Sequence, residues 1–213
     1  MMNNPDCSLS FHQMVIFDSD TKENLGIFGE NAMDKLTARD IFFPGNCTRQ
    51  GKAGFAPSSL MLRKISCPAE GFNKSFKVAS DFLFIVETAL NGYALKLNGI
   101  WGAYRVHRDS VCHSDPENVY RDKIGTILYI YQNIPFLSDV VEQYAGKELS
   151  IKLIGSGQPE LGKKLILKQL INNPLNPRLF ANFILIYFFG KLGIAVSDRF
   201  ASLIRNAKKL LRP

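Results

Sequence analysis

Two side chains of this chain have the types that base and metal chemistry require. Asp81 stands at the head of an apolar stretch, in the run GFNKSFKVASDFLF, and His107 follows in YRVHRDS. A carboxylate in the first turn of a helix is kept ionised by the helix dipole and can take a proton from an attacking hydroxyl. Neutral imidazole is a common ligand of divalent metals.

Each of these residues also has a structural interpretation. Asp81, together with Ser80, has the composition of a helix N-cap. His107 lies between Arg105 and Arg108, as a surface histidine in a basic loop would. Arg105 in turn could bind a phosphate, because its guanidinium matches phosphate oxygens in a bidentate way. The residue types alone leave both interpretations open.

The elements that would position these residues alternate between strands and helices. Residues 7–26 predict a strand, a turn and a second strand, because polar residues alternate with apolar ones and DSD supplies turn chemistry. Periodicity and turn signals then predict a helix at 32–42 capped by Asp34 or Thr37, a strand at 59–63, a helix from 79 to 91, short strands at 93–101 and 103–106, and helices from 116 onward. The fold class is therefore α/β, with a boundary near 118.

Composition narrows the functional classes. The chain has 213 residues, of which 46% are hydrophobic and 21% charged, as in a globular protein. Its four cysteines are scattered, without CxxC spacing, which argues against a structural zinc site and favours a reducing cytoplasm. The first ten residues lack the pattern of a secretory signal.

The basic charge is concentrated in the C-terminal part. Residues 1–120 hold 12 Lys and Arg against 13 Asp and Glu, whereas residues 121–213 hold 14 against 6. This asymmetry predicts an anionic partner. The apolar run at 179–190 is too short to span a bilayer, and 199–212 has the pattern of a basic amphipathic helix. A membrane surface is therefore the expected partner; nucleic acid is unlikely, because the aromatics of this region are not interleaved with basic residues.

Three motifs in order make residues 1–118 resemble a family 2 glycosyltransferase. They are GFNK at 71–74, ASDF at 79–82 and YRVH at 104–107, and the likeness is best from 46 to 114. The resemblance implies a partial GT-A-type α/β fold, followed from 119 to 213 by a helical, basic, membrane-docking extension. Two positions depart from the family pattern: Ser80 replaces the first member of an acidic pair, and Glu87 stands where an arginine is frequent.

The same resemblance assigns roles to individual residues. Asp81 is the expected catalytic base of an inverting transfer, and His107 the expected ligand of the divalent metal, Mn or Mg. Arg105 is the expected phosphate contact. The loop with Gly51, Gly54 and Ser58 would shape the acceptor and donor-sugar pocket. Asp18-Ser19-Asp20 has the spacing of a metal-binding DxD but the position of a later hairpin turn, so we do not assign it to metal.

The function implied is transfer of a sugar from a nucleotide-sugar donor to a glycan or lipid-linked acceptor at the inner face of the cytoplasmic membrane. Because the family's donor-binding DxD region would precede Met1, we expect this part to be inactive alone. The chain could then be a gene fragment, the product of a misplaced start codon, or one half of a split enzyme that another polypeptide completes. The alternative is a non-enzymatic membrane-surface or adaptor protein that uses its basic helical arm.

Overall fold

The computed structural model describes residues 3–42, 54–107, 115–155 and 157–172, together with 174, 180, 181, 183, 184, 187 and 188. The chain divides into two compact units, 1–140 and 141–213. The predicted boundary near 118 differs from this division, since the helix that begins at Pro116 belongs to the first unit. The combination of a mixed sheet with several helices confirms the α/β class.

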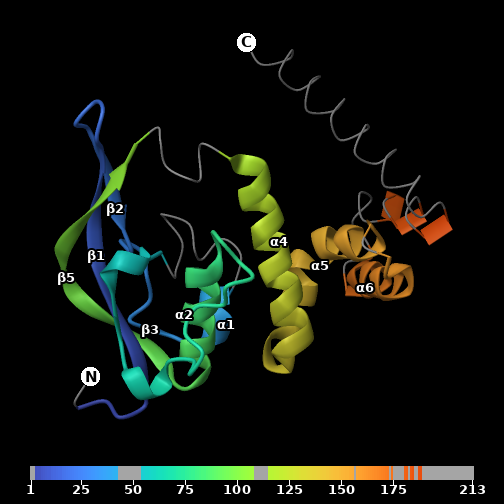
Figure 1. The fold of residues 1–213 in the computed structure, drawn as a ribbon, viewed down its shortest axis with the longest axis horizontal. Coiled ribbons are helices and arrows are strands. Elements are labelled where there is room, and N and C mark those ends of the chain that lie inside the picture. The colour runs from blue at the N-terminus through green and yellow to red at the C-terminus, as the bar shows by residue number, and fades with distance from the viewer. Residues whose placement is uncertain are drawn as a thin grey trace. The chain divides into compact units, whose positions relative to one another are not determined.

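The first unit is built on one mixed sheet. Its described strands are β1 (Cys7–Asp18), β2 (Asn24–Phe28), β3 (Lys35–Leu36), β4 (Leu60–Leu62) and β5 (Tyr93–Val106). The order is β2-β1-β5-β3, and β4 pairs with β1 beside β2. β1 and β5 run parallel, whereas the other pairs are antiparallel. The two longest strands therefore form the centre of the sheet, and both helices α1 and α2 lie on one side of it (Figure 1).

The hairpin at the start of the chain confirms the predicted strand, turn and strand. Met14 to Phe17 pair with Asn24 to Phe28 across the turn. The Asp18 carboxylate accepts hydrogen bonds from the amides of Asp20 and Thr21, at 2.8 and 3.1 Å. This is the way a short acidic side chain stabilises a turn. The first aspartate of DSD thus serves the hairpin.

The helix predicted at 32–42 is wrong over its first half. Lys35 and Leu36 form β3, and only α1 (Ala38–Phe42) is helical. Of the two predicted caps, Thr37 is the one used: its hydroxyl accepts the Asp40 amide, at 3.4 Å, and its own amide donates to the Asp40 carboxylate, at 2.8 Å. The spacing of apolar residues here is compatible with a helix or a strand. Hydrogen bonding to β5 makes Lys35 and Leu36 a strand.

Helix α2 (Ser80–Leu90) confirms the predicted helix. It leads directly into the central strand β5. The four consecutive residues Leu83 to Val86 are all buried. Asn91 ends the helix, as predicted, and its side chain donates to the Ser66 carbonyl. The prediction of two strands after it is wrong, because β5 continues through Gly102. A side chain at that position would crowd Met14, so the glycine permits close packing on β1.

Two more helical elements complete the first unit. α4 (Pro116–Asn133) begins at Asp115, whose carboxylate accepts from the Asn118 amide, and a 3-10 turn covers Pro135–Leu137. Arg39 of α1 binds both carboxylate oxygens of Asp139, at 2.8 and 2.5 Å, and lies over the ring of Phe136. This contact ties the start of the next helix to α1.

The second unit is helical where it is described, as predicted. α5 (Ser138–Gly155) begins in the first unit and turns through Gly157 into α6 (Pro159–Asn172). The two helices touch at Gly162, where a Cβ would lie 2.8 Å from the Ser150 carbonyl, and Lys168 forms an ion pair with Glu142. Among the described residues, no helix has both the length and the apolar character that crossing a membrane requires. Half of the run at 179–190, and all of the predicted basic helix at 199–212, lie outside the described residues.

Candidate functional site

Asp81 lies in the first turn of α2, where its side chain is half-buried. One carboxylate oxygen accepts the amide of Phe82, at 2.6 Å. Burial raises the pKa of this carboxyl above its usual value, against the opposing effects of its backbone hydrogen bonds and the charge of Lys123. A carboxylate that has lost part of its hydration in this way is a stronger base, which suits it to accept a proton near neutral pH.

The capping interpretation of Asp81 and Ser80 is wrong. The N-cap of α2 is Ala79, and no side chain of this segment caps the helix. A carboxylate from elsewhere serves the start of α2: Asp122 of α4 accepts from the amides of Val78 and Ala79, at 2.7 and 2.8 Å. The amide of Lys77 also points to Asp122, at 3.3 Å. Asp81 is therefore not the N-cap of its helix, although its carboxylate accepts the first-turn amide of Phe82.

His107 directly follows the last residue of β5 and is half-buried. An 11-residue helix is about 16 Å long and a 14-residue strand about 46 Å. Because α2 leads directly into β5, its first turn reaches only part of the way along that strand. The far end of β5 extends well beyond α2 (Figure 1). The structure does not bring Asp81 and His107 together into one site.

The other predicted site residues are also spread over the sheet. Arg105 is exposed on β5. Gly54 is buried, and its carbonyl lies so close to Gly29 that a Cβ there would be 2.7 Å away. The Ser58 hydroxyl points to the Met14 sulfur, at 3.7 Å. These contacts pack the loop against the hairpin, while Gly51 lies outside the described residues.

A metal site is not formed by the described residues. Nowhere in that part of the chain do three or more His, Cys, Asp or Glu side chains gather closely enough to hold an ion. No metal site is complete among the described residues, so we derive no step through the divalent metal that the resemblance implies. The metal role of His107 stays a prediction.

Sequence reasoning missed Asp122 and its neighbour Lys123. They stand in the triplet Arg121-Asp122-Lys123, which has the alternating charge typical of a solvated helix face. Nothing in that pattern indicates a partner 43 to 45 residues earlier in the chain. The second carboxylate of α2, Glu87, is half-buried, and burial raises its pKa as well.

Comparison of the chain with protein-family models, with curated proteins and with solved structures gives no match. The candidate site is thus defined by its geometry alone.

Proposed function

We propose that this chain supplies the acceptor side of an inverting, family 2-type glycosyltransferase with a partial GT-A fold, and that Asp81 is its base. The observation that carries the proposal is the state of Asp81. It is a half-buried carboxylate with a raised pKa, in the first turn of a helix whose N-cap residue, Ala79, donates its amide to Asp122. A partly dehydrated carboxylate with a raised pKa is suited to accept a proton.

In the proposed reaction, the oxygen of the acceptor hydroxyl attacks the sugar carbon that bears the nucleotide. The Asp81 carboxylate takes the proton of that hydroxyl as the attack proceeds. The bond to the nucleotide diphosphate breaks on the opposite side, so the sugar inverts. A correctly placed base contributes about 100- to 10,000-fold to such a step. Lys123 is close enough to favour the ionised form of the base.

The remaining parts of the proposal come from the sequence. They are the nucleotide-sugar donor, a divalent metal, and a glycan or lipid-linked acceptor. Docking on an anionic membrane surface from the cytoplasm depends on 199–212, outside the described residues. The alternative of a non-enzymatic adaptor depends on the same segment, and no described contact favours it.

The decisive test is complementation in the cells that make this protein, because any partner is present there. We expect deletion of the gene to remove one sugar from surface or lipid-linked glycans, as read by mass spectrometry. The wild-type gene and the matched control Glu87→Gln, on the same helix, restore it, and Asp81→Asn does not. Full restoration by Asp81→Asn would show that Asp81 is not a base.

Calorimetric titration of the purified chain with uridine diphosphate and manganese then locates the donor. Saturable, metal-dependent binding would place a donor site within this chain. Absence of binding would assign the donor to another polypeptide and leave the acceptor role to this one.

A further inference from the structure

Helix α2 depends on α4 for the start of its backbone. The amides of Lys77, Val78 and Ala79 all point at the carboxylate of Asp122, at 3.3, 2.7 and 2.8 Å. Three amides that converge on one anion at the positive end of a helix make strong, charge-assisted hydrogen bonds. The N-cap residue Ala79 has no capping side chain of its own, so Asp122 anchors the residues that lead into this helix.

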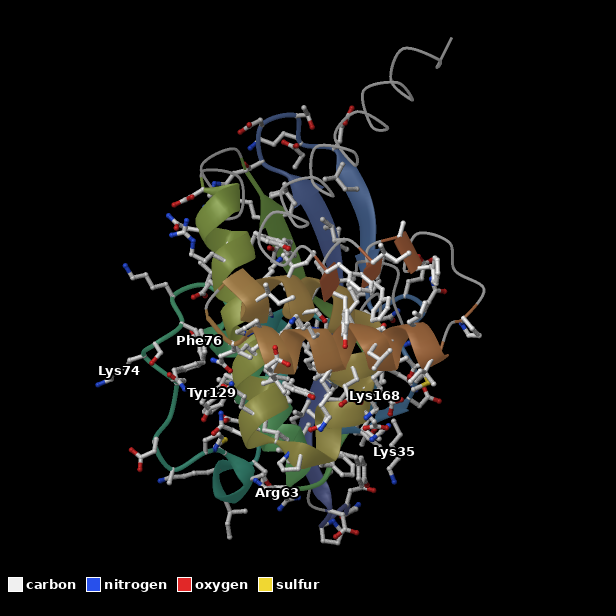
Figure 2. All side chains as sticks on the ribbon, turned by 90° about the vertical axis from the view of Figure 1, so that its right-hand side faces the viewer. Lys35, Arg63, Lys74, Phe76, Tyr129 and Lys168 are labelled. Atoms are coloured by element: carbon white, nitrogen blue, oxygen red, sulfur yellow. The ribbon has the colours of Figure 1, made fainter. Side chains whose placement is uncertain are left out.

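The same face of α4 also contacts Phe76, the residue that precedes these three amides. The Phe76 ring meets the edge of Tyr129, with ring centres 5.8 Å apart (Figure 2). It also lies over Gly125, where a Cβ would be 3.3 Å from it. Asp122, Gly125 and Tyr129 follow at steps of three and four, so they form one stripe along the helix. α4 thus holds the segment 76–79 by an aromatic contact and by charge-assisted hydrogen bonds.

Asp81 is two residues beyond the gripped segment and has no such anchor of its own. Its carboxylate accepts the Phe82 amide, and Lys123, next to Asp122 on α4, acts on it by charge. Any movement of the segment 77–79 relative to α4 would therefore move Asp81 relative to its surroundings.

We propose that Asp122 is the positioning residue of this site: through the amides of 77–79 it holds the Asp81 carboxylate at a fixed place and depth beside α4. This inference deepens the proposed function only in its use of Asp81 as the base, on which it rests. The charged side chain that acts on Asp81 is Lys123, while Asp122 binds the backbone just before Asp81.

The test is Asp122→Asn, a change of nearly equal shape that removes the charge and replaces one acceptor oxygen with a donor. We expect hydrogen exchange at the amides of Val78 and Ala79 to quicken about tenfold or more. We also expect the Asp81 carboxyl, followed by carbon-13 NMR, to titrate closer to an ordinary aspartate, because a loosened helix start lets water reach it.

The matched control is Asp115→Asn on the same helix. Asparagine caps as well as aspartate, so neither the exchange at 78–79 nor the Asp81 titration should change. If Asp122→Asn quickens exchange but leaves the Asp81 titration as in the wild type, Asp122 is a structural anchor only and the proposal is wrong. Should that variant not fold, Asp122→Glu keeps the charge and shifts its place; the same titration must then move in the same direction, and an unmoved one overturns the proposal.

These measurements need no enzymatic activity. A moved Asp81 titration together with full glycan restoration by Asp81→Asn would uphold the positioning and reject the proposed function. An unmoved titration together with failed restoration by Asp81→Asn would reject the positioning role of Asp122 and support the proposed function.

Discussion

The start of α2 and the far end of β5 are two opposite settings for a reactive side chain. Asp81 sits where a helix start is bound by a neighbouring helix and half withdrawn from water. Arg105 lies on a strand whose outer edge, in the described part of the chain, is paired only near Ala94 and Leu95. The packed setting alters the chemistry of its residue, whereas the open one leaves its residue to solvent. Burial and anchoring, more than residue type, separate the two candidates.

The packed region should respond most strongly to a cavity. Leu83, on the inner face of α2, is 0% exposed, and Leu25, on the hairpin, is 41% exposed. We expect Leu83→Ala to lower the free energy of unfolding by about 3 kcal/mol, because it removes buried contacts and leaves a void. Leu25→Ala is the control and should change it by about 0.5 kcal/mol or less. Similar losses in urea titrations of both variants would erase the contrast.

The bridge from α1 to Asp139 is the next test, since it is ionic but exposed. Hydrogen bonds from Arg39 lower the pKa of the Asp139 carboxyl. A lowered pKa stabilises the fold above the pKa of the unfolded chain, about 3.9, and the effect is lost as pH falls through the folded value. Asp139→Asn should cost about 1 kcal/mol or less at pH 7 and nothing in strong acid.

Arg39→Lys is the matched control for that bridge, because it keeps the charge but not the paired hydrogen bonds. We expect a smaller loss of the unfolding free energy at pH 7 than for Asp139→Asn. An Asp139→Asn loss that persists unchanged at low pH would mean that packing, and not the ion pair, is affected.

Asp81 should behave in the opposite sense. Because burial raises its pKa, the folded chain binds the proton more tightly than the unfolded one, and the ionised carboxyl at pH 7 costs stability. Asp81→Asn is therefore expected to raise the free energy of unfolding slightly, by about 0.5 kcal/mol, at pH 7 but not below pH about 4. Urea titrations at both pH values check this; a loss at pH 7 would instead make Asp81 a structural residue.

The open region gives the smallest effect. Trp101 is the single tryptophan of the chain, is 63% exposed, and rests beside His12 with ring centres 5.6 Å apart. We expect iodide to quench its fluorescence almost as strongly as that of free tryptophan, and Trp101→Phe to change the free energy of unfolding by about 0.5 kcal/mol or less. Strong protection from iodide in the purified chain would show that this end of the sheet is covered.

The sequence by itself determined the local elements that carry strong signals. The hairpin, α2 with its end at Asn91, and the helices from Pro116 onward follow from alternation, helical periodicity and turn residues, which act over a few positions. The α/β class follows from them. Asp81 was singled out for the same reason, since an acidic residue heading an apolar helix is visible in the sequence.

Only the tertiary structure decided how these elements serve one another. Pairing with β5 made Lys35 and Leu36 a strand where periodicity favoured a helix. Pairing with β1 kept β5 continuous through Gly102. The packing of α4 beside α2 brought Asp122 to the amides of 77–79. The length of β5 left His107 beyond the reach of α2. Hydrogen bonds and packing between distant segments depend on the path of the whole chain, and neighbouring residues carry no record of that path.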